Sequence, residues 1–307
     1  MIPESYISAL KDGNVVAFPT ETVYGLGASV WNEEAVKKIF ELKGRPSDNP
    51  LIVHVSDLTQ LRELASNVPD IANTLAKAFW PGPLTLILPK TDRVPDLVTA
   101  GLDTVALRMP DHPLAIALIR SVGPLVAPSA NISGRPSPTS SKHVRDDFGD
   151  RIPVLDGGDT QLGLESTVLD LSGAQPLILR PGAIGPEEIR ERTGIKVIYD
   201  DSDSDLKPRS PGQKYTHYKP KANISYGPVD GFRDDTLYLM QSGDSSSENI
   251  ISYNGDLKTL SQELYRRFRE ADQLGYKNLH IDTIEDYKAT FPSLYKALMN
   301  RIRKASG

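Results

Sequence analysis

Side chains that can bind anions recur in this sequence at points where an apolar strand ends. Arg108 closes the apolar run TVALR, and Arg180 closes PLILR. An arginine at the end of an apolar strand needs an anionic partner, either in the protein or in a ligand. Lys43 and Arg45 lie in KGRPSDN, a stretch between a predicted helix and the strand LIVHV. Two cations and the amide of Asn49 on one rigid loop would suit a polyphosphate, because a planar guanidinium can bind two oxygens.

Hydroxyl and amide side chains follow the same pattern. Thr20 and Thr22 follow VVAFP, Ser129 and Asn131 follow PLVAP, and Ser166 stands at the start of a strand. Each has an ordinary structural interpretation, since Thr favours strands, and Ser and Asn favour turns. Their recurrence beside the cations indicates a site for an anionic nucleotide and a small polar co-substrate.

Two residues near the cationic loop keep a structural alternative. Lys43 falls in the last turn of the predicted helix, where a cation bonds free carbonyl groups and complements the helix dipole. His54 lies within LIVHV, and a histidine inside a buried strand is more often a core residue than a ligand. The residues alone leave both alternatives open.

Familiar catalytic signatures are absent from the sequence. There is no GxxxxGK[ST] motif, and YGLGASV only half matches the dinucleotide-binding pattern, since Val30 replaces its third glycine. There are no cysteines, and the five histidines do not have metal-ligand spacing. No GxSxG motif supports an acyl-serine mechanism. The sequence therefore predicts neither covalent catalysis by a protein nucleophile nor a protein-held metal.

The elements that must position these residues alternate between helix and strand over residues 1–198. Asn32 is expected to cap a helix that Gly44 ends, and LIVHV is expected to be a buried strand. Further strands are predicted at VVAFPT, LTLILP, PLVAP, VLD, STVLDLS and PLILR, and further helices at DIANTLAKAFW, PLAIALIRSV and EEIRERTG. This alternation predicts an α/β fold with an open, twisted, mostly mixed sheet and helices packed against it.

A change in composition divides the chain. Residues 199–222 are charged and nearly devoid of apolar side chains, which predicts a linker. Residues 223–307 predict a small Rossmann-like α/β domain, with strands at TLYLM and NLHID and helices at LSQELYRRFREADQLG and SLYKALMNRIRKA. The predicted organisation is thus a first domain, a linker and a small second domain.

Overall composition limits the function classes. The chain has 307 residues, 39% of them hydrophobic and 24% charged, with a formal net charge of −5. No apolar run approaches the roughly 18–20 residues of a membrane span, and the first residues do not have the pattern of a signal peptide. These features predict a cytoplasmic protein without a membrane partner. The acidic balance predicts weak or absent direct RNA binding.

The ordered motifs FPTETVYGLG, KGRP, NPL, SAN, ESTV and LRPG resemble those of the YrdC-type threonylcarbamoyl-AMP synthases. The stretch SPGQKYTHYKP, followed by a small domain, is similar to the linker of the longer members of that family. The resemblance implies an enzyme that condenses L-threonine, bicarbonate and ATP to L-threonylcarbamoyladenylate and releases pyrophosphate. It implies Mg²⁺ on the ATP phosphates, and transfer of the product to a complex that modifies ANN-decoding tRNAs.

The resemblance also implies residue roles. The catalytic cations would be Lys43 and Arg45. The ATP-binding residues would be Lys43, Arg45, Asn49, Thr104, Ser129, Asn131, Arg180 and Tyr218, the last of these on the linker. The threonine-binding residues would be Thr22, His54, Arg108 and Ser166.

Two other functions compete with this one. YrdC-like domains have been associated with double-stranded RNA, so the chain could be an RNA-binding module without catalysis. Against this, its cations stand at strand ends and form no continuous basic face. The other is a carbamoyl-phosphate-handling accessory domain of the kind found in hydrogenase-maturation proteins, which the missing cysteine-rich zinc segments argue against.

Overall fold

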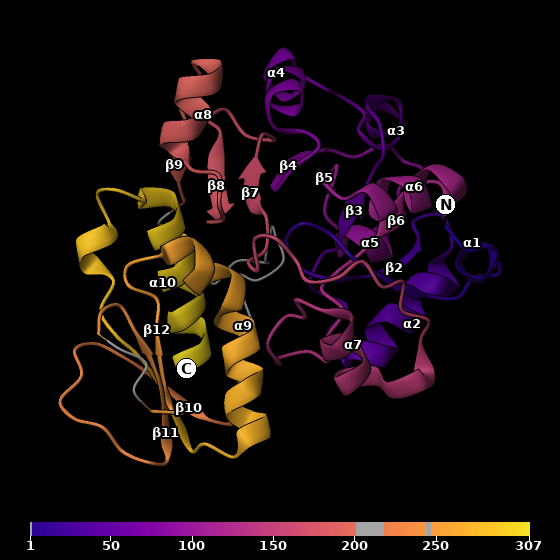
Figure 1. Cartoon of the computed structure of the whole chain (residues 1–307). Helices are drawn as coiled ribbons and strands as arrows, with labels where there is room; N and C mark the ends of the chain where they lie inside the picture. Colours follow the sequence, from indigo (N-terminus) through magenta and orange to yellow (C-terminus); the bar gives the residue numbers. More distant parts are fainter. Residues whose placement is uncertain (1, 201–217, 244–246) are drawn as a thin grey trace.

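The computed structural model describes residues 2–200, 218–243 and 247–307 as two packed α/β units (Figure 1). Most of the predicted linker, residues 199–222, lies outside the described part of the chain, which resumes at Tyr218. Within the described residues, the first unit contains a nine-stranded sheet and the second a four-stranded sheet.

The larger sheet has the strand order β1-β2-β6-β3-β5-β4-β7-β8-β9. Its strands are β1 (Val16–Phe18), β2 (Gly25–Ser29), β3 (Ile52–His54), β4 (Leu84–Pro89), β5 (Thr104–Arg108), β6 (Leu125–Val126), β7 (Thr167–Asp170), β8 (Leu177–Arg180) and β9 (Ile198–Tyr199). The pairs β3–β5, β4–β7 and β8–β9 are parallel, whereas the other neighbours are antiparallel. The predicted mixed α/β sheet is therefore confirmed.

The helices of the first unit lie between these strands in the sequence. They are α1 (Glu4–Lys11), α2 (Glu33–Lys43), α3 (Leu58–Leu64), α4 (Asp70–Phe79), α5 (Asp96–Thr99), α6 (Pro113–Val122), α7 (Ser141–Phe148) and α8 (Pro186–Thr193), with a 3₁₀ turn at Gly149–Arg151. The ends of α2 are as predicted. The side chain of Asn32 accepts a hydrogen bond from the Ala35 amide at 3.0 Å, and Gly44 ends the helix with a positive φ of 59°.

One local expectation differs from the structure. The predicted strand VLD forms only an isolated bridge, from Val154 to Ala17, because the chain leaves the sheet after one residue. The half-matched glycine pattern YGLGASV forms β2, an antiparallel partner of β1. A Cβ at Gly27 would lie 2.7 Å from the Phe18 ring, so this glycine allows a close side-chain approach.

Alternation along the central strands separates two faces of the larger sheet. Val53 of β3 and Leu107 of β5 point into the main core beneath the helices, whereas His54 and Arg108 point to the opposite face. On that opposite face two apolar clusters are buried. One lies under α1 and α6 and includes Val16, Phe18, Leu125 and Ala127. The other is smaller, and its members are Ile52, Ile87, Ala106, Val168 and Leu179. The face that carries the polar strand ends is therefore not occupied by the main core.

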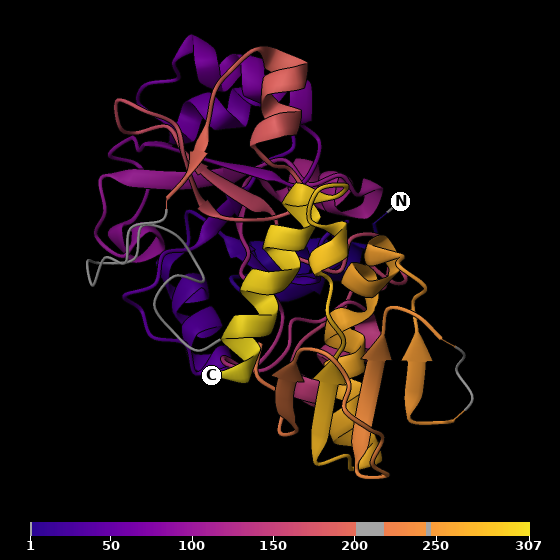
Figure 2. The same cartoon turned by 90° about the vertical axis from the view of Figure 1, so that its left-hand side faces the viewer.

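The second unit is an all-parallel sheet with the order β10-β13-β11-β12. Its elements are β10 (Asn223–Tyr226), β11 (Thr236–Met240), β12 (Ile250–Ser252), α9 (Leu257–Leu274), β13 (Asn278–Ile281), a 3₁₀ turn at Glu285–Tyr287, and α10 (Pro292–Ser306). Inward residues such as Leu239 and Ile281 form one core with Leu264 of α9 and Leu298 of α10. Both helices therefore pack on one face of this sheet, and they lie toward the first unit (Figure 2).

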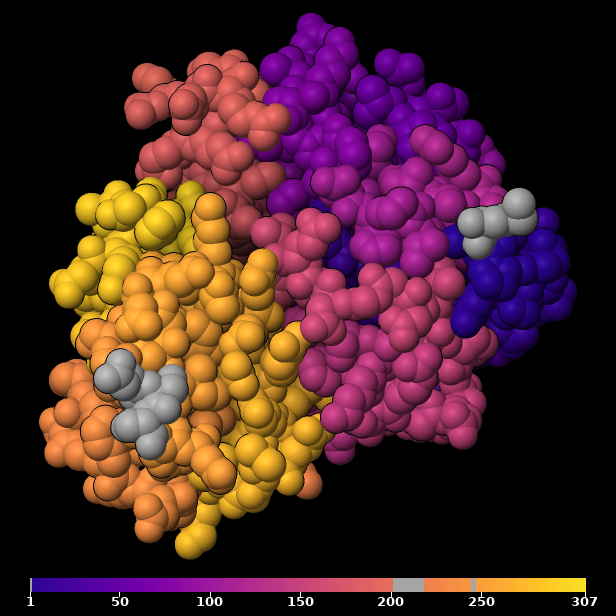
Figure 3. All heavy atoms as spheres, in the orientation of Figure 1, coloured from indigo at the N-terminus to yellow at the C-terminus, as the bar shows by residue number. Residues whose placement is uncertain are grey.

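The two units meet over a broad contact, visible where orange and yellow atoms adjoin magenta and salmon ones in Figure 3. Backbone approaches backbone at Gly163, whose φ is +72° and where a Cβ would lie 2.5 Å from the backbone of Gln262 in α9. The hydroxyl of Ser261 donates to the Leu162 carbonyl at 3.3 Å in the same place. Only glycine fits both the backbone conformation and the space.

We expect Gly163→Ala to loosen the docking of α9 on the first unit. The left-handed conformation costs alanine roughly 1–2 kcal/mol, and the overlap with Gln262 adds to this by forcing the helix away. Thermal unfolding and the radius of gyration in solution are the measurements, with a lower melting temperature and a larger radius expected.

The matched control is Gly194→Ala at the end of α8, where φ is +75° but a Cβ would meet nothing within 4 Å. This variant has the same backbone penalty without the overlap. If both variants unfold alike and keep the wild-type radius, the close approach at Gly163 does not control docking.

Candidate active site

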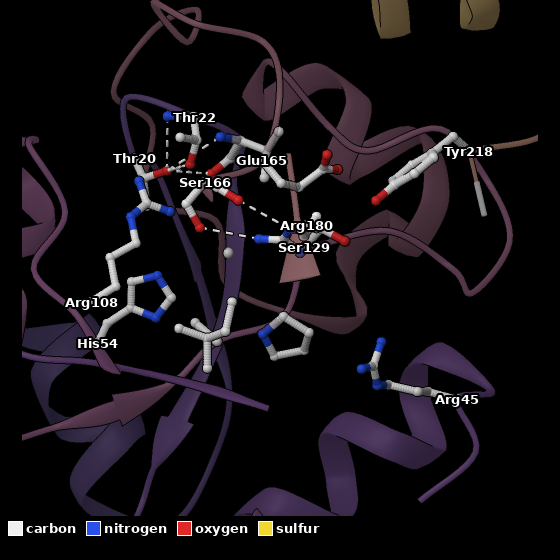
Figure 4. A pocket seen from close by; sticks show the side chains of 15 residues that line it. Thr20, Thr22, Arg45, His54, Arg108, Ser129, Glu165, Ser166, Arg180 and Tyr218 are labelled. Carbon is white, nitrogen blue, oxygen red and sulfur yellow. Dashed lines mark hydrogen bonds between the residues drawn. The ribbon is translucent and has the colours of Figure 1, made fainter. Parts of the chain in front are cut away.

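A pocket opens on the polar face of the larger sheet, beside the small apolar cluster (Figure 4). Its lining comes from the segment between β1 and β2, the loop after α2, the strands β2, β3, β5 and β8, the segment after β6, the two residues before β7, and Tyr218. The lining residues are Thr20, Thr22, Val23, Gly25, Arg45, Ile52, His54, Arg108, Ala127, Pro128, Ser129, Glu165, Ser166, Arg180 and Tyr218. Segments far apart in the sequence are thus brought to one site.

Eight residues predicted from the sequence line this pocket: Thr22, Arg45, His54, Arg108, Ser129, Ser166, Arg180 and Tyr218. Figure 4 shows Arg45 and Tyr218 at one end, and Thr22, His54 and Arg108 at the other. Ser166 and Arg180 lie between the two ends and are joined directly. The Arg180 guanidinium donates to the Ser166 carbonyl at 3.0 Å and to its hydroxyl at 3.1 Å.

Arg108 has an anionic partner within the protein. Its Nη2 lies 2.7 Å from the Glu21 carboxylate, and both side chains are only 4% exposed. Its Nε donates to the Gly82 carbonyl at 3.2 Å. The sequence left open whether this partner belongs to the protein or to a ligand. The structure assigns Glu21, and a ligand carboxylate at Arg108 would share the guanidinium with it.

His54 is a buried, neutral imidazole on the pocket wall. Burial, together with the charge of Arg108, lowers the pKa of His54 from 6.5 to about 3. Its Nδ1 has no hydrogen-bond partner in the described structure, and its ring meets Phe18 edge-on with centroids 6.1 Å apart. An unpaired ring nitrogen beside a pocket is free to bond a ligand.

The turn after β1, which contains Thr20 and Thr22, is held by hydrogen bonds of hydroxyl groups. The Thr20 hydroxyl donates to the Val23 carbonyl at 2.7 Å and lies 2.8 Å from the Thr22 hydroxyl. The Ser166 hydroxyl lies 2.8 Å from that of Thr85. Hydrogen bonds between hydroxyl groups therefore help to fix Thr20, Thr22 and Ser166, and the Ser166 hydroxyl is also bonded to the Arg180 guanidinium.

Four predicted site residues do not line the pocket: Lys43, Asn49, Thr104 and Asn131. Lys43 is 2% exposed and its ammonium donates to the backbone carbonyls of Ser129, at 2.6 Å, and Asn131. Burial, with the nearby Arg45, lowers the pKa of Lys43 well below its usual value. The Asn131 side chain accepts from the Ser129 hydroxyl at 2.6 Å. Lys43 and Asn131 therefore shape the loop that presents Ser129.

Asn49 lies beside a pocket residue, whereas Thr104 lies at the end of β5 opposite to Arg108. The Arg45 guanidinium donates to the backbone carbonyls of Asn49, at 3.3 Å, and Pro50, at 3.2 Å, so Asn49 belongs to the loop that holds Arg45. Thr104 shares a strand face with Arg108, because side chains alternate along β5. Contact of these four residues with a nucleotide stays a prediction.

Glu165 is a pocket residue that the sequence reasoning missed. Burial alone would raise its pKa, but the charges of Arg301 and Arg180 lower the pKa of Glu165 to about 2. Its carboxylate accepts hydrogen bonds from Ser137 at 2.6 Å, Tyr265 at 2.9 Å and Arg301 at 2.9 Å. The motif ESTV could have indicated this residue, since it places a charged side chain two positions before a buried strand.

Over residues 2–200, 218–243 and 247–307, no three His, Asp or Glu side chains gather in a way that could hold a metal ion. Among the helices of the same ranges, none combines the length and the apolar character that a membrane crossing requires.

Comparisons with known proteins identify relatives that cover both units. A family described as "Telomere recombination" matches residues 8–182, and one described as "Threonylcarbamoyl-AMP synthase, C-terminal domain" matches residues 184–307. The threonylcarbamoyl-AMP synthase of Pyrococcus abyssi is 44% identical, over 97% of this chain and 92% of the relative. That of Bacillus subtilis is 47% identical, over 97% and 91%. The crystal structure of P. abyssi Sua5 complexed with L-threonine superposes with a TM-score of 0.88 at 42% identity, covering 98% of this chain and 93% of that one.

We expect His54 to remain uncharged in the folded protein and to make the fold sensitive to acid. The unfolded chain takes up this proton near pH 6.5, whereas the folded pKa is about 3. The unfolded state therefore binds more protons in this interval, and stability is lost as the pH falls through it, by up to about 1.4 kcal/mol per pH unit.

The measurement is the imidazole NMR signal of His54, assigned by its absence in His54→Gln and followed from about pH 8 to about pH 5. A constant chemical shift is expected, together with a shallower loss of stability with acid in the variant. A signal that titrates near pH 6.5 would mean that the ring is open to water.

Proposed function

The chain belongs to the threonylcarbamoyl-AMP synthase family, and from this we propose that it condenses L-threonine, bicarbonate and ATP to L-threonylcarbamoyladenylate with release of pyrophosphate. The observation that carries the proposal is a single pocket with a cationic, aromatic end at Arg45 and Tyr218 and a hydroxyl-rich end at Thr22 and His54. Such a pocket suits a nucleotide at one end and a small amino acid at the other.

The proposed reaction requires that the substrates be positioned against each other and that the negative charge of the phosphates be neutralised. The neutral threonine amine attacks the carbon of bicarbonate, a C–O bond breaks with loss of water, and a carbamate forms; from an activated bicarbonate, the activating group leaves in place of water. A carbamate oxygen then attacks the α-phosphorus of ATP, and the bond to the pyrophosphate leaving group breaks. Neither step requires a protein nucleophile, so the rate depends on how well the reactants and the developing charge are held.

The end with Arg45 and Tyr218 would hold ATP. Arg45 is fixed by the carbonyls of its own loop, so its guanidinium is oriented before the nucleotide arrives. Ser129 and Arg180 would bind phosphate oxygens farther into the pocket. Lys43 would act with Arg45 on the phosphates, a role that requires its ammonium to exchange a carbonyl for the nucleotide.

The end with Thr22, His54, Arg108 and Ser166 would hold threonine. The Arg108 guanidinium is a suitable partner for the amino-acid carboxylate, and Glu21 balances part of its charge while the site is empty. The neutral His54 can accept a hydrogen bond from the amine or the hydroxyl of threonine, since its Nδ1 is unpaired. The Ser166 hydroxyl would join the two substrates, because it is bonded to Arg180.

The proposed reaction also implies a metal ion, a complex that receives the product, and a location in the cell. Mg²⁺ would accompany ATP, bound to its phosphates, and would neutralise charge on the departing pyrophosphate. The adenylate product would pass to a complex that forms threonylcarbamoyladenosine in ANN-decoding tRNAs. This pathway would place the protein in the cytoplasm.

We expect pyrophosphate release to require ATP, threonine and bicarbonate together. The carbamate that attacks phosphorus exists only when both co-substrates are present, so omission of either should leave no more than background release. A coupled pyrophosphate assay in bicarbonate-depleted buffer measures this, with serine in place of threonine as a specificity control. Release that is indifferent to threonine or bicarbonate would instead favour a different use of ATP, and an RNA-binding module would release none.

We expect Arg45→Ala to lose about 100-fold or more of the activity without loss of fold, as is usual for a preorganised group that stabilises transferring charge. Arg45 is half-buried at the pocket, whereas Arg120 is exposed in the last turn of α6. Arg120→Ala is therefore the matched control and should keep wild-type turnover. Wild-type turnover in Arg45→Ala would make that guanidinium a structural group of its loop.

A further inference from the structure

Two arginines of the C-terminal unit reach into the first unit beside the pocket. Arg301 of α10 is fully buried, and Arg269 of α9 is 7% exposed. Arginine is rarely buried unless it is paired, so each of these contacts identifies a specific partner. Glu165, the partner of Arg301, lines the pocket, whereas Asp147, the partner of Arg269, lies in α7 and accepts a hydrogen bond from the loop that follows Ser129.

Arg301 binds the two segments that present Ser166 and Arg180. Its Nε donates to the Glu165 carboxylate at 2.9 Å, and Glu165 directly precedes Ser166. Its Nη1 donates to the Pro181 carbonyl at 2.8 Å, directly after Arg180. One guanidinium from the second unit therefore holds the start of β7 and the end of β8 together.

Arg301 also belongs to an aromatic contact with the pocket. Its guanidinium carbon lies 5.6 Å from the centroid of the Tyr218 ring, and Tyr218 stacks on Tyr265 of α9 with centroids 5.1 Å apart. The Tyr265 hydroxyl donates to Glu165 at 2.9 Å. Glu165 thus receives two hydrogen bonds from the C-terminal unit while its own side chain lines the pocket.

Arg269 binds the segment that presents Ser129. Its two Nη atoms donate to the two oxygens of Asp147, at 3.1 and 2.9 Å, and one of them also donates to the Pro136 carbonyl at 2.5 Å. Asp147 in turn accepts from the Ile132 amide at 3.3 Å and from Arg135 at 3.1 Å. The carboxylate of Asp147 connects the C-terminal unit to the loop that follows Ser129.

These contacts connect docking of the C-terminal unit to the order of the pocket. Undocking would remove Arg301 from Glu165 and Arg269 from Asp147, so that each buried carboxylate would lose one of the two guanidinium charges that compensate its burial. Each carboxylate would have to turn to water, and the segments attached to it would move with it. Since small displacements of positioning groups reduce rates strongly, the pocket is expected to be competent only when both pairs are formed.

We propose that Arg269 and Arg301 are positioning residues of the active site, which couple docking of the C-terminal unit to the ordering of the segments that carry Ser129, Ser166 and Arg180. The consequence for turnover rests on the proposed function. The consequence for the order of the pocket segments does not, because it can be measured without substrates.

The experiment uses the full chain with Arg269→Met and Arg301→Met. Controls on the same helices are Arg266→Met, which removes a solvent-exposed ion pair to Asp159, and Arg303→Met, which removes an exposed cation. Amide hydrogen exchange without substrate is the first measurement. Arg269→Met should speed exchange about tenfold or more at residues 130–135, and Arg301→Met at residues 165–168, while the controls match wild type.

Steady-state kinetics are the second measurement. Arg269→Met should raise the KM for ATP about tenfold and leave the KM for threonine unchanged, because its contacts lie toward Ser129. Arg301→Met should lower kcat about tenfold or more, because it holds the groups between the two substrates. If Arg301→Met does not fold, Tyr265→Phe replaces it, because this variant removes one hydrogen-bond donor to Glu165 and keeps the ring. Tyr265→Phe should lower kcat in the same way, by a smaller factor.

The outcomes separate the two hypotheses. Folded arginine variants that exchange and turn over like their controls overturn the positioning role. Faster exchange at the named segments of the arginine variants, together with no pyrophosphate release by the wild-type protein, supports the coupling and shows that the proposed reaction is wrong. A lower melting temperature with wild-type exchange and wild-type kinetics also overturns the coupling, because the arginines would then only stabilise the fold.

Discussion

The pocket depends most on the hydrogen bonds that the buried carboxylate of Glu165 accepts. This carboxylate is ionised and buried, and it accepts hydrogen bonds from Ser137, Tyr265 and Arg301, which come from three separate parts of the chain. A buried charge of this kind is tolerated only when its oxygens are fully bonded. The three donors must therefore arrive together, and their arrival determines where the next residue, Ser166, stands.

Much of the scaffold could be predicted because its causes are local. The capping of α2 by Asn32 and its end at Gly44 depend on a few neighbouring residues, and the strand LIVHV is defined by its own apolar run. The same applies to eight of the predicted site residues, which the structure brings to one pocket. Each of them stands at a strand end or a loop of recognisable composition, so the local sequence carried the signal.

The remaining features depend on partners distant in the sequence. Arg108 needed an anion, but nothing in TVALRMP indicates that Glu21 supplies it. Lys43 could be placed at a helix end, yet its bonds to the carbonyls of Ser129 and Asn131 require the folded sheet. Glu165 and Arg301 are separated by 136 positions, which no pattern of helix or strand periodicity can connect. Sequence reasoning therefore found the groups that could meet a ligand more readily than the groups that hold them.

The distribution of charge shows what the C-terminal unit contributes to the pocket. A pocket proposed to bind ATP needs cations, and cations held close together away from water repel each other before a ligand arrives. Here Glu21 compensates Arg108, and Glu165 lies between Arg180 and Arg301 and is stabilised by both charges. The cations can thus stay oriented in the absence of phosphate. Because one of the compensating pairs spans the two units, the C-terminal unit contributes to the electrostatics of a pocket whose lining it barely enters.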